Sequence, residues 1–575
     1  MGVLPTRVIW VGSATQHPRL YISNGERANY VSLSHCWGGV SPITTTTDTI
    51  SQRVQGIAYQ NLPKTFQDAI TITRSLGVNY IWIDSLCIVQ DSREDWNREA
   101  ARMKDVYANC YAMIAVDDSP NPHGGCFAPD KDECRSSYAV DSVGPFLSKV
   151  KAFVRLTHMR DHFHMEVSHR IGDPNAAPEL SRSILNQRGW CLQERVLAPR
   201  ILHFGRSEFS WECPETVACE CQPITTSFDK ESRFKALLSD RILRDAQLGK
   251  EDSFTSEQVD IFMWMHFVEE FTRRQLTYHT DILHALSGMA GFMVAAARTE
   301  YACGLWKKEL AEFLLWAVDY GEGPRLGLSA ALPFRLQSSG QTPSSPVRPK
   351  RHESYYAPSW SWASLIGPIK FLVGRLDMSN KDQISHVRKD GKREEVNKNR
   401  ISLLESVDIE CTTDPLNPFG PPQHASLTVH GQTLPVTWTD KTKSANSTYS
   451  RSKNGGTLIF PSSSASSDTT PFAADFEPDL IDADLDVSIG DNFLLLYVLI
   501  DMKAKIAAHE TRGGVPIAFA VEGKMLQGLV LVPVLTAGGN QYSSGAQPVY
   551  RRVGVFEAAG ERWQEVASRR TITIV

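Results

Sequence analysis

Apolar runs and amphipathic stretches alternate along the N-terminal part of the chain, which is the pattern of an α/β protein. The stretch Tyr80 to Asp84 (YIWID) is apolar up to its closing carboxylate, and a second apolar run, Leu86 to Val89, follows Ser85 at once. This pattern is typical of a strand buried on both faces of a parallel sheet. We expect two further strands, Tyr30 to Ser34 and Tyr111 to Val116, to lie beside it in the same sheet.

Helices are predicted between these strands. Pro63 suits the first turn of a helix whose apolar residues recur at helical spacing up to Leu76, and Gly77 is a natural stop. Asp91 or Ser92 then caps a second helix, whose first turn carries two carboxylates in the place that the helix dipole favours. Joined to the three strands, these helices make a right-handed βαβαβ unit.

Further elements flank this unit. Leu4 to Gly12 and Arg19 to Ser23 are β-rich runs split by turn residues, as expected of a hairpin. In residues 117–181, prolines and glycines are spread among short β-like segments. We therefore expect an insertion that covers the edge of the sheet. Trp190 to Glu194 belong to a short helix, and Arg200 to Phe204 form a fourth strand.

The rest of the chain divides into a helical and a β-rich part. Residues 230–320 are predicted to be helical, because the apolar residues around Trp264 recur at the spacing of a buried helix face. Residues 355–575 read as a β-rich C-terminal region with Gly and Pro turns, closed by the last residues of the chain. Polar stretches poor in apolar residues predict mobile loops at residues 338–351, 381–399 and 441–470.

Composition and charge narrow the class of protein. With 575 residues, 42% of them hydrophobic and 22% charged, the chain is long enough for about two to four domains. A net charge of −5, a pI near 6.4 and the lack of an extended Lys/Arg run argue against a nucleic-acid partner. We find no signal peptide, no apolar run near the roughly 20 residues of a membrane span, and no spaced cysteine framework. We therefore expect a soluble protein of the reducing cytoplasm.

Polar side chains follow the predicted strands, at the place where open α/β sheets bind ligands. They are Ser34, His35, Trp37 and Gly38-Gly39 after the first strand, and Asp84, Ser85, Cys87 and Gln90 after the second. A simpler alternative is that Asp84 only caps or hydrogen-bonds a neighbouring loop and that the Gly pair is only a turn. We expect Trp37, Asp84, Cys87, Gln90 and Glu194 to converge on one cleft at the C-terminal edge of the sheet.

Glu194 is a second candidate for chemistry. It lies four residues after Trp190, so the two side chains share one face of the predicted helix. A carboxylate held against an aromatic ring in a cleft tends to have a raised pKa and to serve acid/base or electrostatic roles. The alternative is an exposed glutamate that pairs with Arg188 or Arg195.

Two groups of residues contain the side chains that metals prefer, but their spacing is wrong. They are Cys213, Cys219 and Cys221 with His203, and His162, His164 and His169 with Glu166. The first group lacks a C-x-x-C pair, and the second matches neither H-E-x-x-H nor a zinc-finger pair. We expect no metal site.

Three blocks of the sequence resemble those of the fungal heterokaryon incompatibility (HET) domain, in the order of that family. They are YVSLSHCWGG from Tyr30, the stretch from Leu62 to Tyr107 around YIWIDSLCIVQ, and RGWCLQERVLAPRILHF from Arg188. The resemblance implies a HET domain over about residues 5–215, with the insertion inside it. Glu269 to Met293 and APSWSWAS from Ala357 resemble further regions of large HET proteins, which often carry a long segment upstream of the first block that we do not find here.

HET domains in turn resemble the Toll/interleukin-1 receptor (TIR) fold, a five-stranded parallel sheet. The resemblance implies an α/β fold with a TIR-like parallel sheet, in which Tyr30 to Ser34, Tyr80 to Asp84 and Tyr111 to Val116 match the first three strands. Trp190 to Glu194 matches the W-x-x-x-E helix of that fold. In TIR domains that hydrolyse NAD, the glutamate of this helix is catalytic, and the matching position here is Glu194.

The TIR resemblance implies a candidate NAD glycohydrolase, with NAD as its substrate. The resemblance implies Glu194 as a catalytic residue, and from their places at the strand ends we add Asp84 and Cys87 as catalytic candidates. The expected binding residues are Ser34, His35, Trp37, Gly38, Gln90 and Trp190. Trp37 or Trp190 would stack on the nicotinamide ring. The Gly38-Gly39 loop and the helix that begins near Pro63 would face the phosphates.

Two functions are compatible with these patterns. The first is an effector of fungal non-self recognition and programmed cell death, acting by NAD hydrolysis or by assembly with itself or with an incompatibility partner protein. The second is a biosynthetic or housekeeping enzyme that uses the HET scaffold for a small-molecule reaction. The three intact blocks favour the first function, and the missing upstream segment favours the second.

Overall fold

The structure is a computed structural model of the chain. It describes residues 2–13, 15–39, 43–127, 137–141, 151–155, 183–205, 208–220, 222–225, 235, 254–297, 299–319, 349–372, 400–415, 417–439, 456–459, 473–478, 492–512, 515–534, 549–559 and 567–575. The chain forms two compact units, each built from several segments. The N-terminal unit comprises Met1–Gln258, Arg274–Ala296 and Pro415–Asn417, and the C-terminal unit comprises Val259–Arg273, Ala297–Asp414 and Pro418–Val575.

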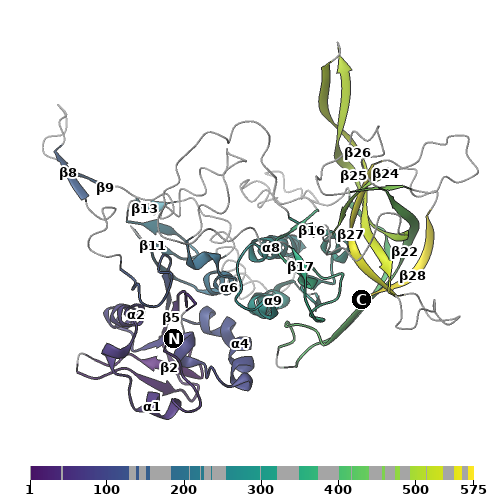
Figure 1. Ribbon diagram of the computed structural model, residues 1–575. Coiled ribbons are helices and arrows are strands. Elements are labelled where there is room, and N and C mark those ends of the chain that lie inside the picture. Colours follow the sequence, from purple (N-terminus) through teal and green to yellow (C-terminus); the bar gives the residue numbers. More distant parts are fainter. Residues whose placement is uncertain are drawn as a thin grey trace, which may run out of the picture. The chain divides into compact units, whose positions relative to one another are not determined.

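A nine-stranded sheet organises the N-terminal unit (Figure 1). Its strand order is β13-β12-β11-β10-β7-β5-β6-β2-β3. The four central strands β10, β7, β5 and β6 are parallel, and the strands outside them are antiparallel. In chain order the strands are β2 (Arg7–Trp10), β3 (Arg19–Ile22), β5 (Val31–Ser34), β6 (Tyr80–Trp82), β7 (Ala112–Val116), β10 (Ile201–Phe204), β11 (Phe209–Glu212), β12 (Val217–Cys219) and β13 (Gln222–Thr225). A separate pair joins β1 (Gly2–Val3) and β4 (Arg27–Ala28).

The three central strands predicted from the apolar runs are confirmed as parallel neighbours. Val31 of β5 lies opposite Ile81 of β6 on one side and Ala112 of β7 on the other. The predicted hairpin is confirmed as the antiparallel pair β2–β3, and the predicted fourth strand is β10. The sheet as a whole is mixed, not parallel, because short antiparallel strands extend it at both edges.

Helices connect the parallel strands as expected. α2 (Lys64–Ser75) follows Pro63 and ends before Gly77, whose φ is +69°. α4 (Arg93–Ala108) is capped by Ser92, whose Oγ accepts a hydrogen bond from the Asp95 amide at 3.2 Å. Right-handed crossovers from β5 to β6 and back across β5 to β7 require these helices on opposite faces of the sheet. Figure 1 shows α2 and α4 on opposite sides of β5.

The strand predicted at Tyr80 to Asp84 is shorter than expected. β6 ends at Trp82, and Asp84–Cys87 form the short helix α3. The amides of Leu86 and Cys87 donate to the Ile83 carbonyl at 3.0 and 2.8 Å, so the backbone turns directly after the strand. The apolar run continues because both the strand and the turn of helix are buried, and hydrophobicity alone does not separate them.

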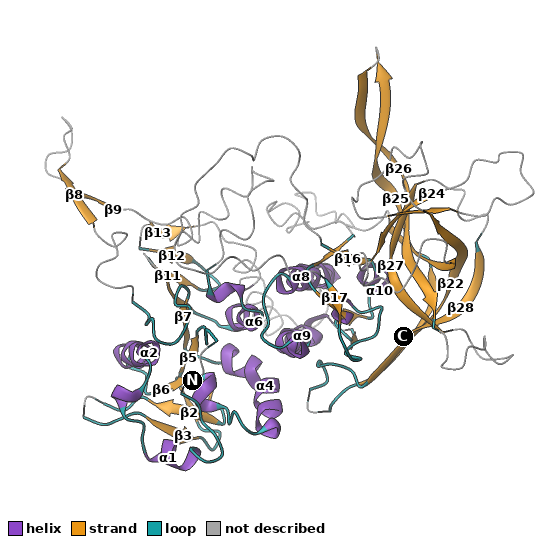
Figure 2. Cartoon of the chain, in the orientation of Figure 1, coloured by secondary structure: helices purple, strands orange, loops and turns teal. Residues whose placement is uncertain are grey.

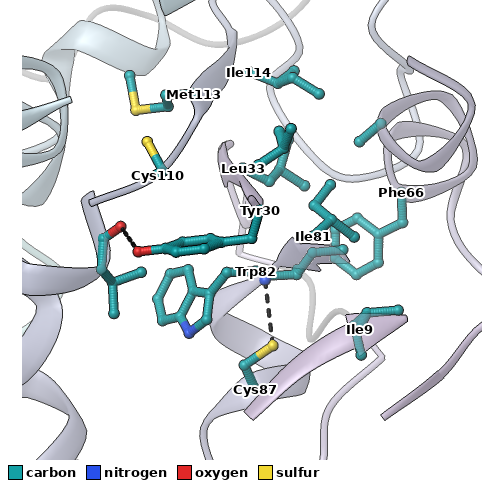
Figure 3. Packing of buried hydrophobic residues seen from close by; sticks show 14 of the residues in the cluster. Ile9, Tyr30, Leu33, Phe66, Ile81, Trp82, Cys87, Cys110, Met113 and Ile114 are labelled. Carbon is teal, nitrogen blue, oxygen red and sulfur yellow. Dashed lines mark hydrogen bonds between the residues drawn. The ribbon is translucent and has the colours of Figure 1, made fainter. Parts of the chain in front are cut away.

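A hydrophobic core on the parallel strands fixes their register (Figure 3). Trp82 and Tyr107 are buried and meet edge to face with ring centroids 5.7 Å apart. The buried Tyr30 hydroxyl donates to the Val106 carbonyl at 2.6 Å, so this polar group is satisfied within the core. The core therefore ties β5 and β6 to α4 and sets where the side chains after these strands emerge.

Short helices complete the N-terminal unit. The predicted helix at Trp190 is confirmed as α6, which runs from Trp190 to Leu197. The part of the predicted insertion that the structure describes includes the antiparallel pair β8 (Ser137–Asp141) and β9 (Lys151–Arg155). The remaining helices of this unit are α1 (Ile50–Gln55), η1 (Tyr59–Asn61), η5 (Leu185–Gln187), η6 (His279–Asp281) and α9 (His284–Ala297).

The predicted β-rich C-terminal region forms a second large sheet (Figure 2). Strand pairs run from β25 through β26, β27, β24, β23 and β22 and return to β25, so the pairing forms a ring. β28 joins β22 and β27, so the last strand of the chain closes the region as expected. The strands are β20 (Arg400–Ser402), β21 (Leu404–Thr412), β22 (His424–Thr439), β23 (Gly456–Ile459), β24 (Ala473–Pro478), β25 (Asn492–Arg512), β26 (Val515–Pro533), β27 (Val549–Ala559) and β28 (Ser568–Ile574).

The predicted helical region, residues 230–320, is divided between the two units. The described residues after Ala297 include short strands as well as helix. α8 (Phe254–Thr272) begins in the N-terminal unit and continues into the C-terminal unit. The elements that follow in the C-terminal unit, up to residue 371, are β14 (Tyr301–Ala302), β15 (Leu305–Trp306), α10 (Leu310–Leu314), β16 (Trp316–Val318), β17 (Lys350–Arg351), η7 (Trp362–Ser364), β18 (Leu365–Ile366) and β19 (Ile369–Phe371).

The APSWSWAS segment is a packing element of the C-terminal unit. Trp360 and Trp362 are fully buried. The indole N–H groups of Trp362 and Trp264 both donate to the Gly304 carbonyl, at 3.0 and 2.8 Å. Arg552 is also fully buried, 3.4 Å from the centre of the Trp316 ring, and donates to the Leu314 carbonyl at 2.7 Å. A buried guanidinium is stable here because an aromatic face and carbonyl oxygens replace its water.

Two sets of predictions fall wholly or largely outside the described residues. His162, His164, Glu166 and His169 lie in such a segment. So do most of the predicted mobile loops, although Lys350–Arg351 and Gly456–Ile459 within them are strands. No helix in the described part of the chain is long and apolar enough to cross a membrane.

Candidate functional site

The strand order places a ligand-binding position between β5 and β7. The parallel strands follow the order β6-β5-β7-β10, in which the chain first extends to one side of β5 and then to the other. Open α/β sheets bind ligands beyond the C-terminal ends of the two strands where this reversal occurs. Ser34 ends β5, and Asp117 directly follows β7.

Glu194 of α6 lies at this position. Its side chain is only 5% exposed, and Ser34 Oγ donates a hydrogen bond to Glu194 Oε2. The Cys191 sulfur lies 3.7 Å from the same hydroxyl. Burial raises the pKa of Glu194 above its usual range, although Arg188 and the Ser34 hydroxyl oppose that shift. The alternative of an exposed glutamate that pairs with Arg188 or Arg195 is wrong about exposure, because Glu194 is buried. Arg195 pairs with Glu212, whereas the charge of Arg188 does act on Glu194.

Arg188 is a component of the site, although the sequence analysis considered it only as a partner of an exposed Glu194. Its guanidinium donates to the His35 carbonyl, directly after β5. Burial would lower the pKa of Arg188, but Cys191 and Glu194 raise it, and the net direction is upward. The guanidinium of Arg188 therefore stays charged, and it interacts electrostatically with Glu194 and Asp84. Its position one turn before the helix of Glu194 was the available signal.

His35 is a buried neutral imidazole. Burial lowers its pKa to about 4, against the opposing effect of Asp84. Its ring meets Phe66 edge to face, with centroids 5.1 Å apart. Among the described residues, neither ring nitrogen has a hydrogen-bond partner. Such a group has unused donor and acceptor capacity at the end of β5.

Trp37, Asp84 and Gln90 form a half-buried group beside these residues. Trp37 Nε1 donates to Asp84 Oδ2 at 2.9 Å, and the Ser85 amide donates to Asp84 Oδ1 at 2.7 Å. Gln90 Nε2 donates to the Asp84 carbonyl at 3.2 Å. These contacts match the simpler alternative, in which Asp84 holds neighbouring loops. The charge of Asp84 nevertheless contributes to the pKa shifts of Glu194 and His35, so this group borders the buried one.

Cys87 lies in the hydrophobic core and not with the other candidates. Figure 3 shows its sulfur beside Trp82 and Ile9, facing the Ile83 amide at 3.5 Å. Burial raises the pKa of its thiol to about 12, so the thiolate is disfavoured. The expected convergence of all five strand-end residues is therefore wrong for Cys87, because the backbone turn of α3 directs it inward.

Trp190 does not share its surroundings with Glu194. Its indole N–H donates to Asp281 Oδ2 at 3.2 Å, and its ring meets Trp96 edge to face with centroids 6.4 Å apart. Trp96 also contacts His284, with ring centroids 5.5 Å apart. A spacing of four residues places Trp190 and Glu194 on one face of the helix, but each side chain contacts different neighbours in the fold.

Residues 274–296, which lie outside the predicted HET domain, contact α6 and the residues just before it. The Gly189 amide donates to the Gln275 carbonyl at 2.7 Å, and the Gln275 amide donates to the Gln187 carbonyl at 2.6 Å. Gly288 of α9 lies so close to Gln193 that an added Cβ would stand 2.6 Å from Oε1. The helix that carries Glu194 is therefore held by a segment about 80 residues later in the chain.

The two expected phosphate-facing elements are occupied by the chain itself. A Cβ on Gly38, whose φ is +66°, would meet the Pro120 carbonyl oxygen at 2.2 Å, so Gly38 is needed for close packing. At the start of α2 the Thr65 amide donates to the Pro122 carbonyl at 3.0 Å, and the Gly125 amide donates to Thr65 Oγ1 at 3.1 Å. Gly39 differs, because no atom lies within 4 Å of a Cβ built there.

A second buried polar cluster lies at the ends of β7 and β10. His203 bridges two carboxylates, with Nδ1 3.0 Å from Asp117 Oδ2 and Nε2 3.1 Å from Glu212 Oε2. Arg195 Nε and Lys235 Nζ each lie 3.0 Å from Glu212. Burial alone would lower the pKa of His203, but the two carboxylates raise it to about 9. We name this the His203 cluster; the sequence motifs did not predict it.

The cysteines near His203 serve other contacts. Cys219 donates to the Glu208 carboxylate. Cys221 lies outside the described residues. Within the described part of the chain, no group of three or more His, Cys, Asp or Glu residues is arranged to hold a metal ion.

The comparisons with known proteins identify one domain. No curated protein and no solved structure matches the chain. A family model does match, over residues 30–194, a range that begins just before β5 and ends at the glutamate bonded to Ser34. The family is described as heterokaryon incompatibility protein (HET), so the chain carries a HET domain between residues 30 and 194.

Proposed function

We propose that this chain acts in heterokaryon incompatibility and cell death, through hydrolysis of NAD by a TIR-like HET domain. The HET match supports the broad role. The parallel strand order β6-β5-β7-β10, with its reversal at β5, supports a TIR-like arrangement. The observation that carries the catalytic part is the buried Glu194 carboxyl, hydrogen-bonded to Ser34 at that reversal.

Cleavage of the bond between nicotinamide and ribose passes through an oxocarbenium-like state. A buried carboxylate stabilises such a cation strongly, because little water screens the interaction. Burial raises the pKa of Glu194 in the free protein, and the developing positive charge of the substrate would favour its ionised form. The Ser34 hydroxyl would hold the carboxylate in one orientation.

Arg188 and His35 would bind other parts of the substrate. Arg188 is a half-buried cation next to the end of β5, suited to a phosphate of the nucleotide. His35 is neutral and unbonded among the described residues, suited to a hydroxyl or an amide. Trp37 remains the candidate for stacking on the nicotinamide ring, since Trp190 packs on Trp96.

The test is NAD turnover by the purified full chain, alone and under conditions that promote self-assembly. Glu194→Gln keeps the size of the side chain and removes its charge, so we expect a loss of about 100-fold or more in the rate of nicotinamide release. Glu94→Gln is the control, because that carboxylate is 89% exposed. Full turnover by Glu194→Gln would remove Glu194 from the mechanism. A wild type without turnover would instead favour signalling by assembly with a partner protein, or a different small-molecule substrate.

A further inference from the structure

Two cysteines far apart in sequence meet in the C-terminal unit. Cys303 Sγ, in the turn between β14 and β15, lies 3.5 Å from Cys411 Sγ on β21. The turn is held firmly: Ser361 Oγ donates to the Cys303 carbonyl at 2.5 Å, and two indoles donate to the Gly304 carbonyl. The φ of Cys303 is +52°, a conformation that a cysteine adopts only where neighbours enforce it.

The two thiols are not equivalent. Cys303 is 1% exposed, whereas Cys411 is partly exposed. The hydrogen bond between the sulfurs raises the pKa of Cys303 and lowers that of Cys411. The accessible sulfur is thus the one that ionises more easily, and the thiolate is the nucleophilic form. A buried second thiol in contact with it is the arrangement of an attacking and a resolving cysteine.

We propose that Cys303 and Cys411 form a redox-active dithiol, which a hydroperoxide oxidises to an intramolecular disulfide. The Cys411 thiolate attacks the outer oxygen of the hydroperoxide, the O–O bond breaks, and the alcohol leaves after taking up a proton. Cys411 is then a sulfenic acid. The Cys303 sulfur attacks the sulfur of that group, the S–O bond breaks, and water leaves with the thiol proton. Two thiols are oxidised to one disulfide, and one hydroperoxide is reduced to an alcohol and water.

The cross-link requires little movement. The sulfurs must approach from 3.5 Å to the roughly 2.05 Å of a disulfide bond. Cys303 lies on the fixed turn, so Cys411 supplies the movement near the end of β21, where side chains are at most partly buried. The closed loop spans 108 residues, and such a cross-link restricts the unfolded chain. We therefore expect oxidation to raise the unfolding temperature of the C-terminal unit.

The experiment treats the reduced full-length protein with hydrogen peroxide, blocks free thiols and maps peptides without reduction. We expect a peptide pair linked through Cys303 and Cys411 at stoichiometric peroxide. Cys213→Ser is the matched control, because Cys213 is also partly exposed and has no cysteine contact among the described residues, so this variant should form the same link. In Cys303→Ser, we expect a dimedone adduct on Cys411.

Two further readouts separate the proposal from ordinary surface oxidation. In the unmodified wild type, iodoacetamide should alkylate Cys411 several-fold faster than Cys213 at neutral pH. In Cys411→Ser, Cys303 should give neither a disulfide nor an adduct, because it is buried. The proposal is overturned if Cys411 reacts with iodoacetamide no faster than Cys213. It is also overturned if peroxide links Cys303 and Cys411 to other cysteines, or leaves both without a disulfide.

Discussion

Glu194 and Glu212 are two glutamates of the same unit, both almost fully buried, with opposite electrostatics. Glu194 is 5% exposed and Glu212 is fully buried. Within the described residues no ion pair reaches Glu194, which is hydrogen-bonded to the Ser34 hydroxyl and the Cys191 thiol. Glu212 contacts His203, Arg195 and Lys235. Burial raises the pKa of Glu194, whereas the three cations hold the pKa of Glu212 well below its usual range despite burial.

The contrast separates the carboxyl that we propose for chemistry from one that is held in a network of ion pairs. A fully paired buried ion contributes to the fold only with its partners present, and removing one partner leaves the others uncompensated. A buried carboxyl without a direct ion pair is destabilised in its charged form, as the raised pKa of Glu194 shows despite the charge of Arg188. A cationic transition state would stabilise that charged form. Equal burial of the same residue type therefore leads to opposite predictions for the same substitution.

The largest expected effect is on Glu212→Gln. This substitution leaves Arg195 and Lys235 buried without their carboxylate, so we expect a loss of about 3–5 kcal/mol in the free energy of unfolding of the N-terminal unit. Hydrogen-exchange protection of β10 and β11 amides in the full chain measures it. If Glu212→Gln and Glu194→Gln cost the same, the distinction between the two carboxylates fails.

The next effect is the pH dependence of the His203 cluster. The pKa of His203 rises from 6.5 to about 9 in the folded protein, because Asp117 and Glu212 favour its charged form more than burial disfavours it. Its contribution is complete below pH 6.5 and is lost as the pH rises through 9, a change of about 3 kcal/mol. We expect protection factors of β10 amides to fall over this range, and the fall to be much smaller in His203→Gln. An equal fall in both proteins would assign the pH dependence to other groups.

The smallest effect is expected for Glu194→Gln, and at neutral pH it is a gain of stability and not a loss. The folded protein favours the protonated carboxyl, so its contribution to stability is complete below pH 4.5 and is lost as the pH rises through the raised pKa. Gln cannot ionise, and its amide can still accept the Ser34 hydrogen bond. We expect the unfolding temperature of Glu194→Gln to match the wild type at acidic pH and to exceed it at neutral pH. A variant less stable at neutral pH would show that the charge of Glu194 supports the fold.

β6 and β7 were predictable because each is a short, nearly continuous apolar run, and β5 was predictable because Val31 and Leu33 alternate with serines. The same apolar signal misled after Trp82, where the strand ends and the chain turns into α3 (Asp84–Cys87) although Leu86 and Cys87 are as apolar as the strand. β11 to β13 were not predicted, since each has only three or four residues; those of β11 and β12 alternate between buried and partly exposed. Hydrophobicity reports burial, and the choice between strand and helix depended on the few backbone bonds around Ile83.

The candidate site was predictable only in part. Ser34 and Glu194 were named from motifs and do meet. Cys87 and Trp190 were named for the same reason and do not join them, because spacing along one element does not determine which neighbour a side chain contacts. The His203 cluster assembles from β7, β10, β11 and α6, so no single stretch of sequence contained it.

The support of α6 by residues 274–296 has a consequence for how this domain is inherited and exchanged. The family match ends at residue 194, yet the helix that carries Glu194 continues to Leu197, and the residues just before it, Gln187 and Gly189, are hydrogen-bonded to Gln275. A gene segment cut at the end of the match would encode a domain that lacks these contacts and exposes Trp96 and Trp190. Recombination that moves the HET domain between proteins would therefore preserve its Glu194 site only when it transfers residues up to Ala296 together with the match.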